Sequence, residues 1–213
     1  TVVSSMGADV KDYDNDGLVD VLVLRGAWLG RLGRIPNSLL RNNGDGTFRD
    51  VTIEAGLGVA RPTQTATWLD YNGDGLLDLF IGNETTGPER HRCELYRNLG
   101  NGTFKEIGAL AGVAFDVNGA ARGAMGIDAA RYRDDGALGI AIANFANEMT
   151  GLYVCNKDPM LFTDEAIADG IGPAGRLALK FGVFFFDYDL DGRLDLLTAN
   201  GHLEEEISKI QAS

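Results

Sequence analysis

The sequence is organised around a nine-residue acidic loop that occurs first at Asp12–Asp20. Its aspartates stand at positions 1, 3, 5 and 9 of the segment DYDNDGLVD. Gly17 at position 6 suits a sharp turn, because glycine has no Cβ to restrict the backbone. Hard oxygen ligands at positions 1, 3 and 5, with a backbone carbonyl at position 7, are the pattern of a calcium loop. The apolar, β-branched run after the loop indicates that a strand, not an EF-hand helix, follows it.

The same loop returns along the chain. Intact copies occupy 70–78 and 187–195, and a degenerate copy occupies 131–139. The spacing is 58, 61 and 56 residues, measured between the position-6 glycines Gly17, Gly75, Gly136 and Gly192. A period of this length that holds several short strands indicates an array of repeated β-sheet units.

Three calcium ions are predicted, one in each intact loop. Side-chain oxygens of positions 1, 3, 5 and 9 and the carbonyl of position 7 are the expected ligands. For the first ion they are Asp12, Asp14, Asp16, Leu18 and Asp20. For the second they are Asp70, Asn72, Asp74, Leu76 and Asp78. For the third they are Asp187, Asp189, Asp191, Arg193 and Asp195.

The degenerate loop Arg131–Gly139 is predicted to hold no calcium. Arg131 and Arg133 replace the first two carboxylates, and guanidinium groups stay protonated at any relevant pH. We expect one of these arginines to take the place of the ion and to pair with Asp134, Asp135 or Asp128. An ion pair would then hold this repeat where calcium holds its neighbours.

Each repeat predicts four short strands. The first strand runs into the loop, as at 65–69 and 181–186, and the second leaves it, as at 18–24 and 76–81. After a longer connection comes a strand, a Gly-rich hairpin turn and another strand, as at 39–48 and 95–104. The chain is therefore predicted to be all-β.

Two repeated positions predict how the repeats pack. Gly7, Gly126 and Gly182 each lie in a first strand, five residues before the loop, where a glycine often marks close backbone approach. Phe48 and Phe104 follow the hairpin turns and are expected to point between neighbouring repeats.

Composition narrows the possible functions. The 213 residues are 45% hydrophobic, which is enough for a sizeable core. A formal net charge of −12 argues against nucleic acid as a partner. There is no run of 18 apolar residues, so no membrane-spanning helix is expected. Cys93 and Cys155 occupy non-equivalent positions in their repeats, which favours two buried free thiols over a disulfide.

The loop D-x-D-x-D-G-x-x-D between two strands, followed by the hairpin N-x-G-x-G-x-F, resembles the FG-GAP or VCBS repeat of integrin-α-type β-propellers. Phe181-Gly182 matches the first half of that name, and no Gly-Ala-Pro follows. The segments SSMGADVKDYDNDG and LDLLTANGH are similar to the ASPIC/UnbV, cartilage-acidic-protein-like family. The resemblance covers nearly the whole chain. It implies a propeller, typically seven-bladed, with Ca²⁺ on each intact loop of a secreted, periplasmic or cell-surface protein.

The expected fold is part of a β-propeller, with about three and a half four-stranded blades. We expect one partial domain over residues 1–213, with repeats at approximately 1–58, 59–118, 119–175 and 176–213. Complete propellers have about 4–8 blades, and an open one exposes strand edges. We therefore expect the rest of the propeller, in a longer protein, or another chain to complete the ring.

The favoured function is a calcium-binding extracellular scaffold or a module that binds protein or carbohydrate. The alternative is the propeller domain of a polysaccharide-acting, lyase-like enzyme. His91 and His202 are candidate catalysts, but each is a lone histidine, and no Ser/His/Asp pattern or zinc-type cluster accompanies them. We therefore favour a protein without a catalytic site. Tandem calcium repeats of the thrombospondin type are closely spaced and cysteine-rich, so the wide spacing here excludes them.

A partner surface is predicted on the connections that follow the second strands, because varied loops often carry binding function. The first connection is basic and aromatic, with Trp28, Arg31 and Arg34. Arg90 and His91 lie in the next one. For the first connection, a solvated loop that covers a neighbouring repeat is the alternative, and it is the interpretation that we favour.

Overall fold

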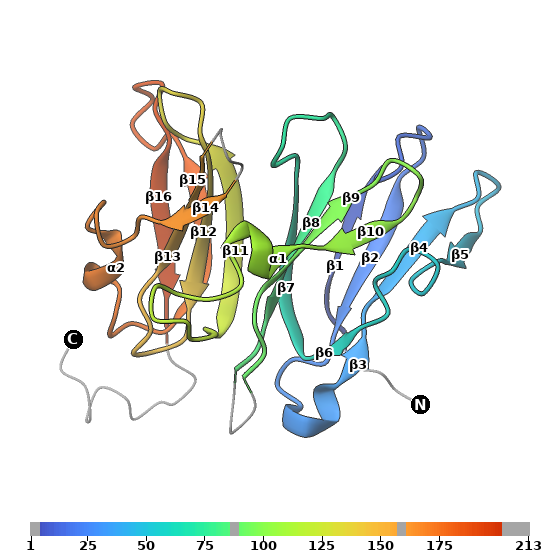
Figure 1. The fold of residues 1–213 in the computed structure, drawn as a ribbon, viewed down its shortest axis with the longest axis horizontal. Helices are drawn as coiled ribbons and strands as arrows, with labels where there is room; N and C mark the ends of the chain where they lie inside the picture. Colours follow the sequence, from blue (N-terminus) through green and yellow to red (C-terminus); the bar gives the residue numbers. More distant parts are fainter. Residues whose placement is uncertain (1–4, 86–89, 157–160, 202–213) are drawn as a thin grey trace.

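The computed structural model describes residues 5–85, 90–156 and 161–201. They form five antiparallel sheets, four of which follow one another along the chain and stand side by side in an arc (Figure 1). Of these four, the first three have four strands each and the last has two, and the fifth sheet is a small two-stranded one. The prediction of an all-β chain with about three and a half propeller blades is confirmed.

The blades consist of the following strands. The first contains β1 (Ser5–Lys11), β2 (Asp20–Arg25), β4 (Ser38–Asn42) and β5 (Phe48–Asp50). The second contains β7 (Thr63–Leu69), β8 (Asp78–Asn83), β9 (Glu94–Asn98) and β10 (Phe104–Glu106). The third contains β11 (Ala124–Arg131), β12 (Leu138–Asn144), β13 (Gly151–Cys155) and β14 (Phe162–Asp164). The fourth contains β15 (Lys180–Phe186) and β16 (Asp195–Asn200).

Short elements connect the blades. A 3₁₀ turn, η1 (Gly30–Gly33), precedes β3 (Ile35–Pro36), which pairs with β6 (Ala60–Arg61) between the first two blades. The single helical turns α1 (Gly108–Ala111) and α2 (Ile171–Ala174) follow the fourth strands of the second and third blades. The nine-residue loops lie at the upper end of the blades in Figure 1, η1, β3 and β6 lie at the lower end, and the helical turns α1 and α2 lie between the two ends.

The first strands of neighbouring blades contact one another, so they form the inner edge of the arc. Close backbone approach occurs at Gly126, where an added Cβ would lie 2.7 Å from the Phe181 carbonyl oxygen of the next blade. At Gly7 no atom lies within 4 Å of that position, and at Gly182 the nearest is a ring carbon of Phe184 in the same blade. The prediction therefore holds for Gly126 alone.

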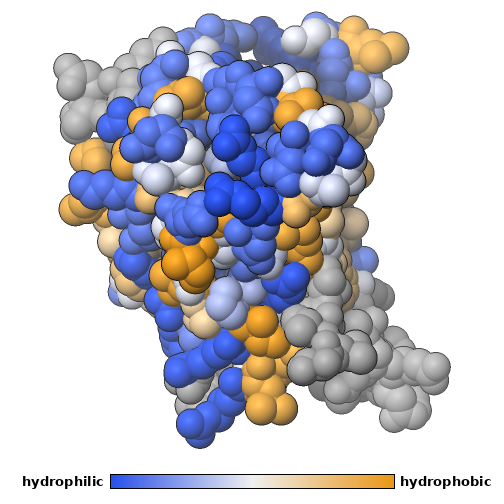
Figure 2. All heavy atoms as spheres, turned by 90° about the vertical axis from the view of Figure 1, so that its right-hand side faces the viewer, coloured by the Kyte–Doolittle hydropathy of each residue, from blue (hydrophilic) through white to orange (hydrophobic). Residues whose placement is uncertain are grey.

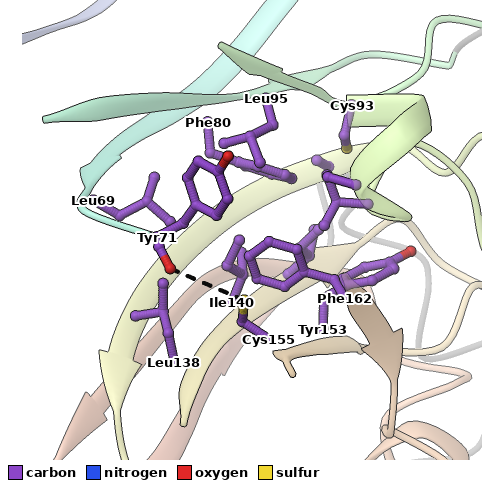
Figure 3. Close-up of a cluster of buried hydrophobic side chains, with 14 residues drawn as sticks. Leu69, Tyr71, Phe80, Cys93, Leu95, Leu138, Ile140, Tyr153, Cys155 and Phe162 are labelled. Carbon is purple, nitrogen blue, oxygen red and sulfur yellow. Dashed lines mark hydrogen bonds between the residues drawn. The ribbon is translucent and has the colours of Figure 1, made fainter. Parts of the chain in front are cut away.

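The hydrophobic core lies mainly between blades. In the cluster shown in Figure 3, Tyr71, Phe80 and Leu95 of the second blade face Ile140 and Phe162 of the third. An equivalent cluster joins the first blade to the second, and a third one joins β12 and β13 to β15. Each blade thus stabilises its neighbours by burying apolar surface against them.

Aromatic residues at two repeated positions meet across the first two blade interfaces, and at the third, Tyr132 stacks instead on Phe185 of β15, with ring centroids 5.2 Å apart. Tyr13, at loop position 2 of the first blade, packs against Phe104 in the hairpin of the second, with ring centroids 5.7 Å apart. Tyr71 and Phe162 repeat this contact at 6.2 Å between the second and third blades. The prediction for Phe104 is confirmed. Phe48 is 47% exposed because no preceding blade covers it.

The glycine that closes each of the first two repeats fits against the next hairpin. Gly56 has φ +83, and an added Cβ would lie 2.9 Å from the Phe104 carbonyl oxygen. Gly112 has φ +85 and the same relation to Phe162, at 2.7 Å. Both the left-handed backbone and the close carbonyl therefore require glycine at these positions.

The two ends of the arc are open and unlike each other. Figure 2 shows the outer face of the first blade, where hydrophobic patches lie among hydrophilic residues. On the fourth blade, Phe184 is 52% exposed and Tyr188, the counterpart of Tyr13, is 68% exposed. An incomplete arc with exposed apolar faces implies completion by other parts of the fold.

Cys93 and Cys155 are both buried free thiols, as predicted. Burial raises the pKa of Cys93 to about 12, so this thiol remains protonated and unreactive at neutral pH. No helix among the described residues is long and apolar enough to cross a membrane.

Replacing Phe104 with alanine should destabilise the chain far more than replacing Phe48. Phe104 is 7% exposed, and its removal leaves a cavity beside Tyr13 and Trp68, which costs about 3–5 kcal/mol. Phe48 stands at the same position of its own hairpin but lies open, so F48A is the matched control. Urea denaturation of both variants tests this; equal losses would contradict the inter-blade role of the hairpin phenylalanine.

Candidate metal centres

The first loop fixes three of its carboxylates with backbone amides. The Asp12 oxygens accept hydrogen bonds from Asp16 N at 3.1 Å and Gly17 N at 2.9 Å. Asp16 Oδ1 accepts one from Leu18 N at 2.9 Å. Asp20, only 1% exposed, accepts one from Tyr13 N at 3.3 Å. Its other oxygen accepts one from the backbone N–H of Asn42 on β4, at 2.8 Å.

The other two intact loops repeat this network. Asp70 accepts from Gly75 N at 3.0 Å, and Asp187 accepts from Gly192 N at 2.8 Å. The closing Asp78 accepts from Tyr71 N at 3.2 Å and from Asn98 N at 2.8 Å. Backbone amides therefore hold the carboxylates at positions 1, 5 and 9 in each intact loop, although the residues between them differ from loop to loop.

Loop position 4 is left-handed in each intact copy. It holds Asn15 with φ 59, Gly73 with φ 74 and Leu190 with φ 62. Leucine rarely adopts this backbone conformation, so the carboxylate network must over-determine the turn at Leu190. The loop geometry is therefore a built feature of the fold, held against local preference.

The carboxylates of the first and last loops are grouped as a cation requires. Oxygens of Asp12, Asp14 and Asp20 lie within 4.8 Å of one another, and so do those of Asp187, Asp189 and Asp195. Oxygens that all sit about 2.3–2.6 Å from one Ca²⁺ are separated by no more than about 5 Å. The donor set of these two loops fits calcium.

Two further observations point to missing positive charge. Asp14 Oδ1 is buried and has no hydrogen-bond partner in the described part of the chain. Burial raises the pKa of Asp78 to about 6, against the opposing effect of two backbone hydrogen bonds. Asp78 is therefore a carboxyl whose ionised form the protein alone compensates incompletely, whereas Asp14 has the Arg41 guanidinium 2.8 Å from its other oxygen.

The second loop departs from the other two. Position 3 is Asn72, whose Nδ2 donates to Asp74 Oδ2 at 2.8 Å. The grouped carboxylates of the first and last loops stand at positions 1, 3 and 9, and the position-5 aspartates Asp16 and Asp191 are outside those sets. Because position 3 is an asparagine, the second loop offers only Asp70 and Asp78 as carboxylates at these positions, with the Asn72 side-chain oxygen as the third donor.

Sequence reasoning missed a repeated arginine position. Its arginine contacts the first loop in the first blade and the second loop in the second blade. Arg41 on β4 lies 2.8 Å (Nε) from Asp14 Oδ2 and 3.0 Å (Nη2) from Asp16 Oδ2. Its counterpart Arg97 on β9 lies 3.7 Å from Asp74 Oδ2. The corresponding residue of the third blade is Cys155, beside the loop that carries its own arginines. This repeated arginine, just before the hairpin asparagine, was the available signal.

The degenerate loop is held by its arginines, with partners that differ in part from those predicted. Arg131 Nη1 donates to the Gly136 carbonyl at 2.9 Å, inside the loop. Arg133 lies 3.8 Å from Asp135, as predicted, but pairs more closely with Glu165, at 2.6 Å. Asp128 does not pair with either arginine; it accepts a hydrogen bond from Phe185 N of the fourth blade, at 2.8 Å.

A family comparison agrees with these repeats. The model of the FG-GAP-like repeat matches residues 12–81 and 70–142, which span the first two intact loops and the degenerate one. The chain belongs to the FG-GAP-like repeat family. Its curated relatives include cartilage acidic protein 1 of Homo sapiens, 30% identical over 175 residues, which cover 78% of this chain and 24% of that protein. The Mus musculus protein is 29% identical over 175 residues, covering 78% of this chain and 25% of the relative.

This FG-GAP-like chain therefore spans about a quarter of the length of the curated relatives it matches. A solved structure, the Dos1 propeller, is 12% identical with a TM-score of 0.40, covering 75% of this chain and 36% of that one. The propeller arrangement is given by the sheets of this chain, and not by that distant likeness.

The residues predicted for a partner surface do not all lie on one. Trp28 is 40% exposed, and Arg90 is exposed and lies 3.7 Å from Glu148. Arg31 and Arg34 are exposed at the 3₁₀ turn. His91 is only 8% exposed, so tertiary packing covers most of it, and its part in partner binding stays a prediction. His202 lies outside the described residues.

Asn98 should contribute more stability than its counterpart Asn42, because it also ties the first blade's loop to the second blade. Asn98 Nδ2 donates to Leu77 O at 3.0 Å and to Tyr13 O at 2.9 Å, whereas Asn42 makes only the equivalent of the first bond, to Val19 O. We expect N98A to cost about 1–2 kcal/mol more than N42A in denaturant unfolding. Equal costs would show that the inter-blade bond is not formed in solution.

Proposed function

We propose that this chain is a calcium-binding part of an extracellular propeller that acts as a scaffold or as a module that binds protein or carbohydrate. The observation that carries this proposal is the network repeated in the three intact loops, which fixes the carboxylates and leaves Asp14 Oδ1 buried without a partner. The family membership supports it, because the matched residues 12–81 and 70–142 include the first two intact loops.

The proposed role of the metal is structural. The ligands would be the residues predicted above, with the Leu18, Leu76 and Arg193 carbonyls completing each set. When bound, calcium supplies the positive charge that relieves repulsion among carboxylates a few ångströms apart. Asp20 joins the loop between β1 and β2 to the backbone of β4, so charge neutralisation at this aspartate would stabilise three strands together.

The proposed location is secreted, periplasmic or on the cell surface. Loops of this kind in extracellular modules bind calcium with dissociation constants of order 10⁻⁴–10⁻³ M, which suits calcium-rich surroundings. The proposed partners are the remaining blades, in the same protein or in another chain, and an extracellular protein or glycan.

An enzymatic role is not favoured by any particular observation. Among the described residues His91 is buried, and it lines neither of the cavities that contain its neighbour Arg90. A general acid or base must reach the substrate, and a covered histidine does not. The binding interpretation is therefore preferred.

Calcium should raise the melting temperature. At a hundredfold excess over Kd, each occupied site adds about 2.7 kcal/mol, which raises the midpoint by roughly 5–10 °C per site in a domain of this size. Thermal melts with EGTA and with 10 mM CaCl₂ test this. Superimposed melts would refute the structural role.

Matched variants locate the effect. D16N, D74N and D191N remove one charge from each intact loop but keep an acceptor for the backbone amide that each aspartate holds. The triple variant should lose the calcium-dependent shift. D135N alters the equivalent position of the degenerate loop, where Asp135 accepts from Ala137 N, and should leave the shift unchanged.

Removing Arg41 should tighten calcium binding to the first loop. Its guanidinium neutralises Asp14 and Asp16 in the absence of metal and would repel the ion. Because an exposed pair is worth about 0–1 kcal/mol, R41M should strengthen binding by up to about fivefold. Isothermal titration in the D74N/D191N background isolates the first loop. Weaker binding would mean that Arg41 positions the ligands instead of competing with the ion.

A further inference from the structure

Two adjoining cavities open at the ends of the second strands, opposite the acidic loops. They have volumes of about 330 Å³ and 720 Å³ and share Arg90 and Glu148 in their walls. We call the pair the strand-exit groove. With second strands of six or seven residues, this groove lies about 20 Å from the acidic loops, so its chemistry is separate from theirs.

The smaller cavity is assembled from three blades. Trp28 comes from the connection of the first blade, Glu84 from the end of β8, and Phe145 and Glu148 from the segment after β12. These residues follow the second strands of successive blades, so the repeated fold itself brings them together. Their chemistry differs although their positions in the repeat correspond.

Trp28 is held in a strained backbone conformation. Its φ is +65, which is unusual for a bulky residue. Its backbone N–H donates to Glu84 Oε2 at 2.6 Å, and Glu84 is only 5% exposed. A buried carboxylate from the second blade thus pins the tryptophan of the first blade. Trp28 remains 40% exposed, so part of its aromatic ring is accessible to a ligand.

Glu148 is fixed just as firmly at the centre of the groove. Its Oε2 accepts a hydrogen bond from Gly123 N at 2.8 Å. Its backbone carbonyl accepts one from Lys180 Nζ at 3.1 Å, and Lys180 is fully buried. Glu148 Oε1 lies 3.7 Å from Arg90 Nη1, too far for a direct hydrogen bond. A ligand hydroxyl fits between these two groups, donating to the carboxylate and accepting from the guanidinium.

The larger cavity adds a second aromatic side chain and further donors. Phe115 lines it and is 41% exposed. Arg122 is anchored to Asp116 at 3.1 Å and to the Met149 carbonyl at 3.2 Å. Arg176 is exposed at the wall, and its side chain has no hydrogen bond or ion pair with the described residues. The groove therefore alternates aromatic side chains with charged groups of both signs.

We propose that the strand-exit groove binds an oligosaccharide, with one sugar ring stacked on Trp28 and its hydroxyl groups shared between Glu148 and Arg90. A pyranose ring combines an apolar C–H face with hydroxyls that both donate and accept, which matches this alternation. The locally balanced charges and the net charge of −12 do not suit a highly charged polyanion. The proposal deepens the proposed function by naming the surface and the ligand class.

Tryptophan fluorescence of the whole chain, in calcium buffer, provides the test. The chain has two tryptophans, and Trp68 is buried at 9% exposure, so a change on ligand addition reports on Trp28. The probes are defined tetrasaccharides of neutral hexoses, of N-acetylhexosamines and of uronic acids. At least one class should give a saturating blue shift. No response from any class up to 10 mM would overturn the proposal.

Variants decide whether the groove is the binding site. W28A should weaken binding at least tenfold and W28F should retain most of it. E148Q keeps an acceptor for Gly123 N but loses the charge, and should weaken binding about tenfold. L32A, in the same connection and at an 83% exposed residue, is the matched control and should bind normally. Binding that survives W28A in a folded variant overturns the assignment.

Parallel probes separate the ligand classes. If uronic-acid oligomers alone bind, R176Q should weaken them, because Arg176 is then the carboxylate partner. Acidic and basic decapeptides are titrated alongside; a peptide response without a sugar response overturns the proposed ligand. The D16N/D74N/D191N variant, assayed below its melting temperature, should still bind the sugar, so failure of the calcium proposal and failure of this one are distinguishable.

Discussion

The buried closing aspartates of the first two acidic loops make the interaction on which the blade geometry depends, whereas Asp195 of the last loop is only half-buried and its blade has no third strand. Asp20 and Asp78 are almost completely buried, and each accepts backbone hydrogen bonds from loop position 2 and from the third strand. A carboxylate in such surroundings is stable only if hydrogen bonds or positive charge compensate its desolvation. The hydrogen bonds that compensate this buried carboxylate therefore hold the loop, the second strand and the third strand together.

The blades depend on one another because residues of each blade pack against, or bond to, residues of the blade before it. The loop tyrosine of one blade packs against the hairpin phenylalanine of the next, and the closing glycine makes room for that phenylalanine's carbonyl. Asn98 reaches back to the carbonyl of Tyr13, and Phe185 N reaches back to Asp128. Apolar burial therefore provides most of the stabilisation, and a small set of directional bonds fixes how the blades are aligned.

The features that were predictable from the sequence are local and repeated. The acidic loops, the strands on either side and the hairpins occupy short segments whose residue types carry the signal. The bond from Asn98 to Tyr13 joins residues 85 positions apart, and the burial of His91 depends on packing by distant segments; neither leaves a local pattern. Arg41 and the tyrosine at loop position 2 were visible as repeats, but their contacts depend on a neighbouring strand or blade. The strand-exit groove was only partly foreseen, through Trp28 and Arg90, because Glu84 and Glu148 come from other blades.

The unlike ends of the arc have a consequence for self-association. At one end Phe48 is exposed and has no tyrosine packed against it. At the other end Tyr188 is exposed and has no phenylalanine packed against it. Complementary but different surfaces at the two ends form heterologous, head-to-tail contacts, which end only when a rotation closes them into a ring. Copies of this segment that associated through these two ends would therefore form an open filament, unless the rotation between neighbours closed them into a ring.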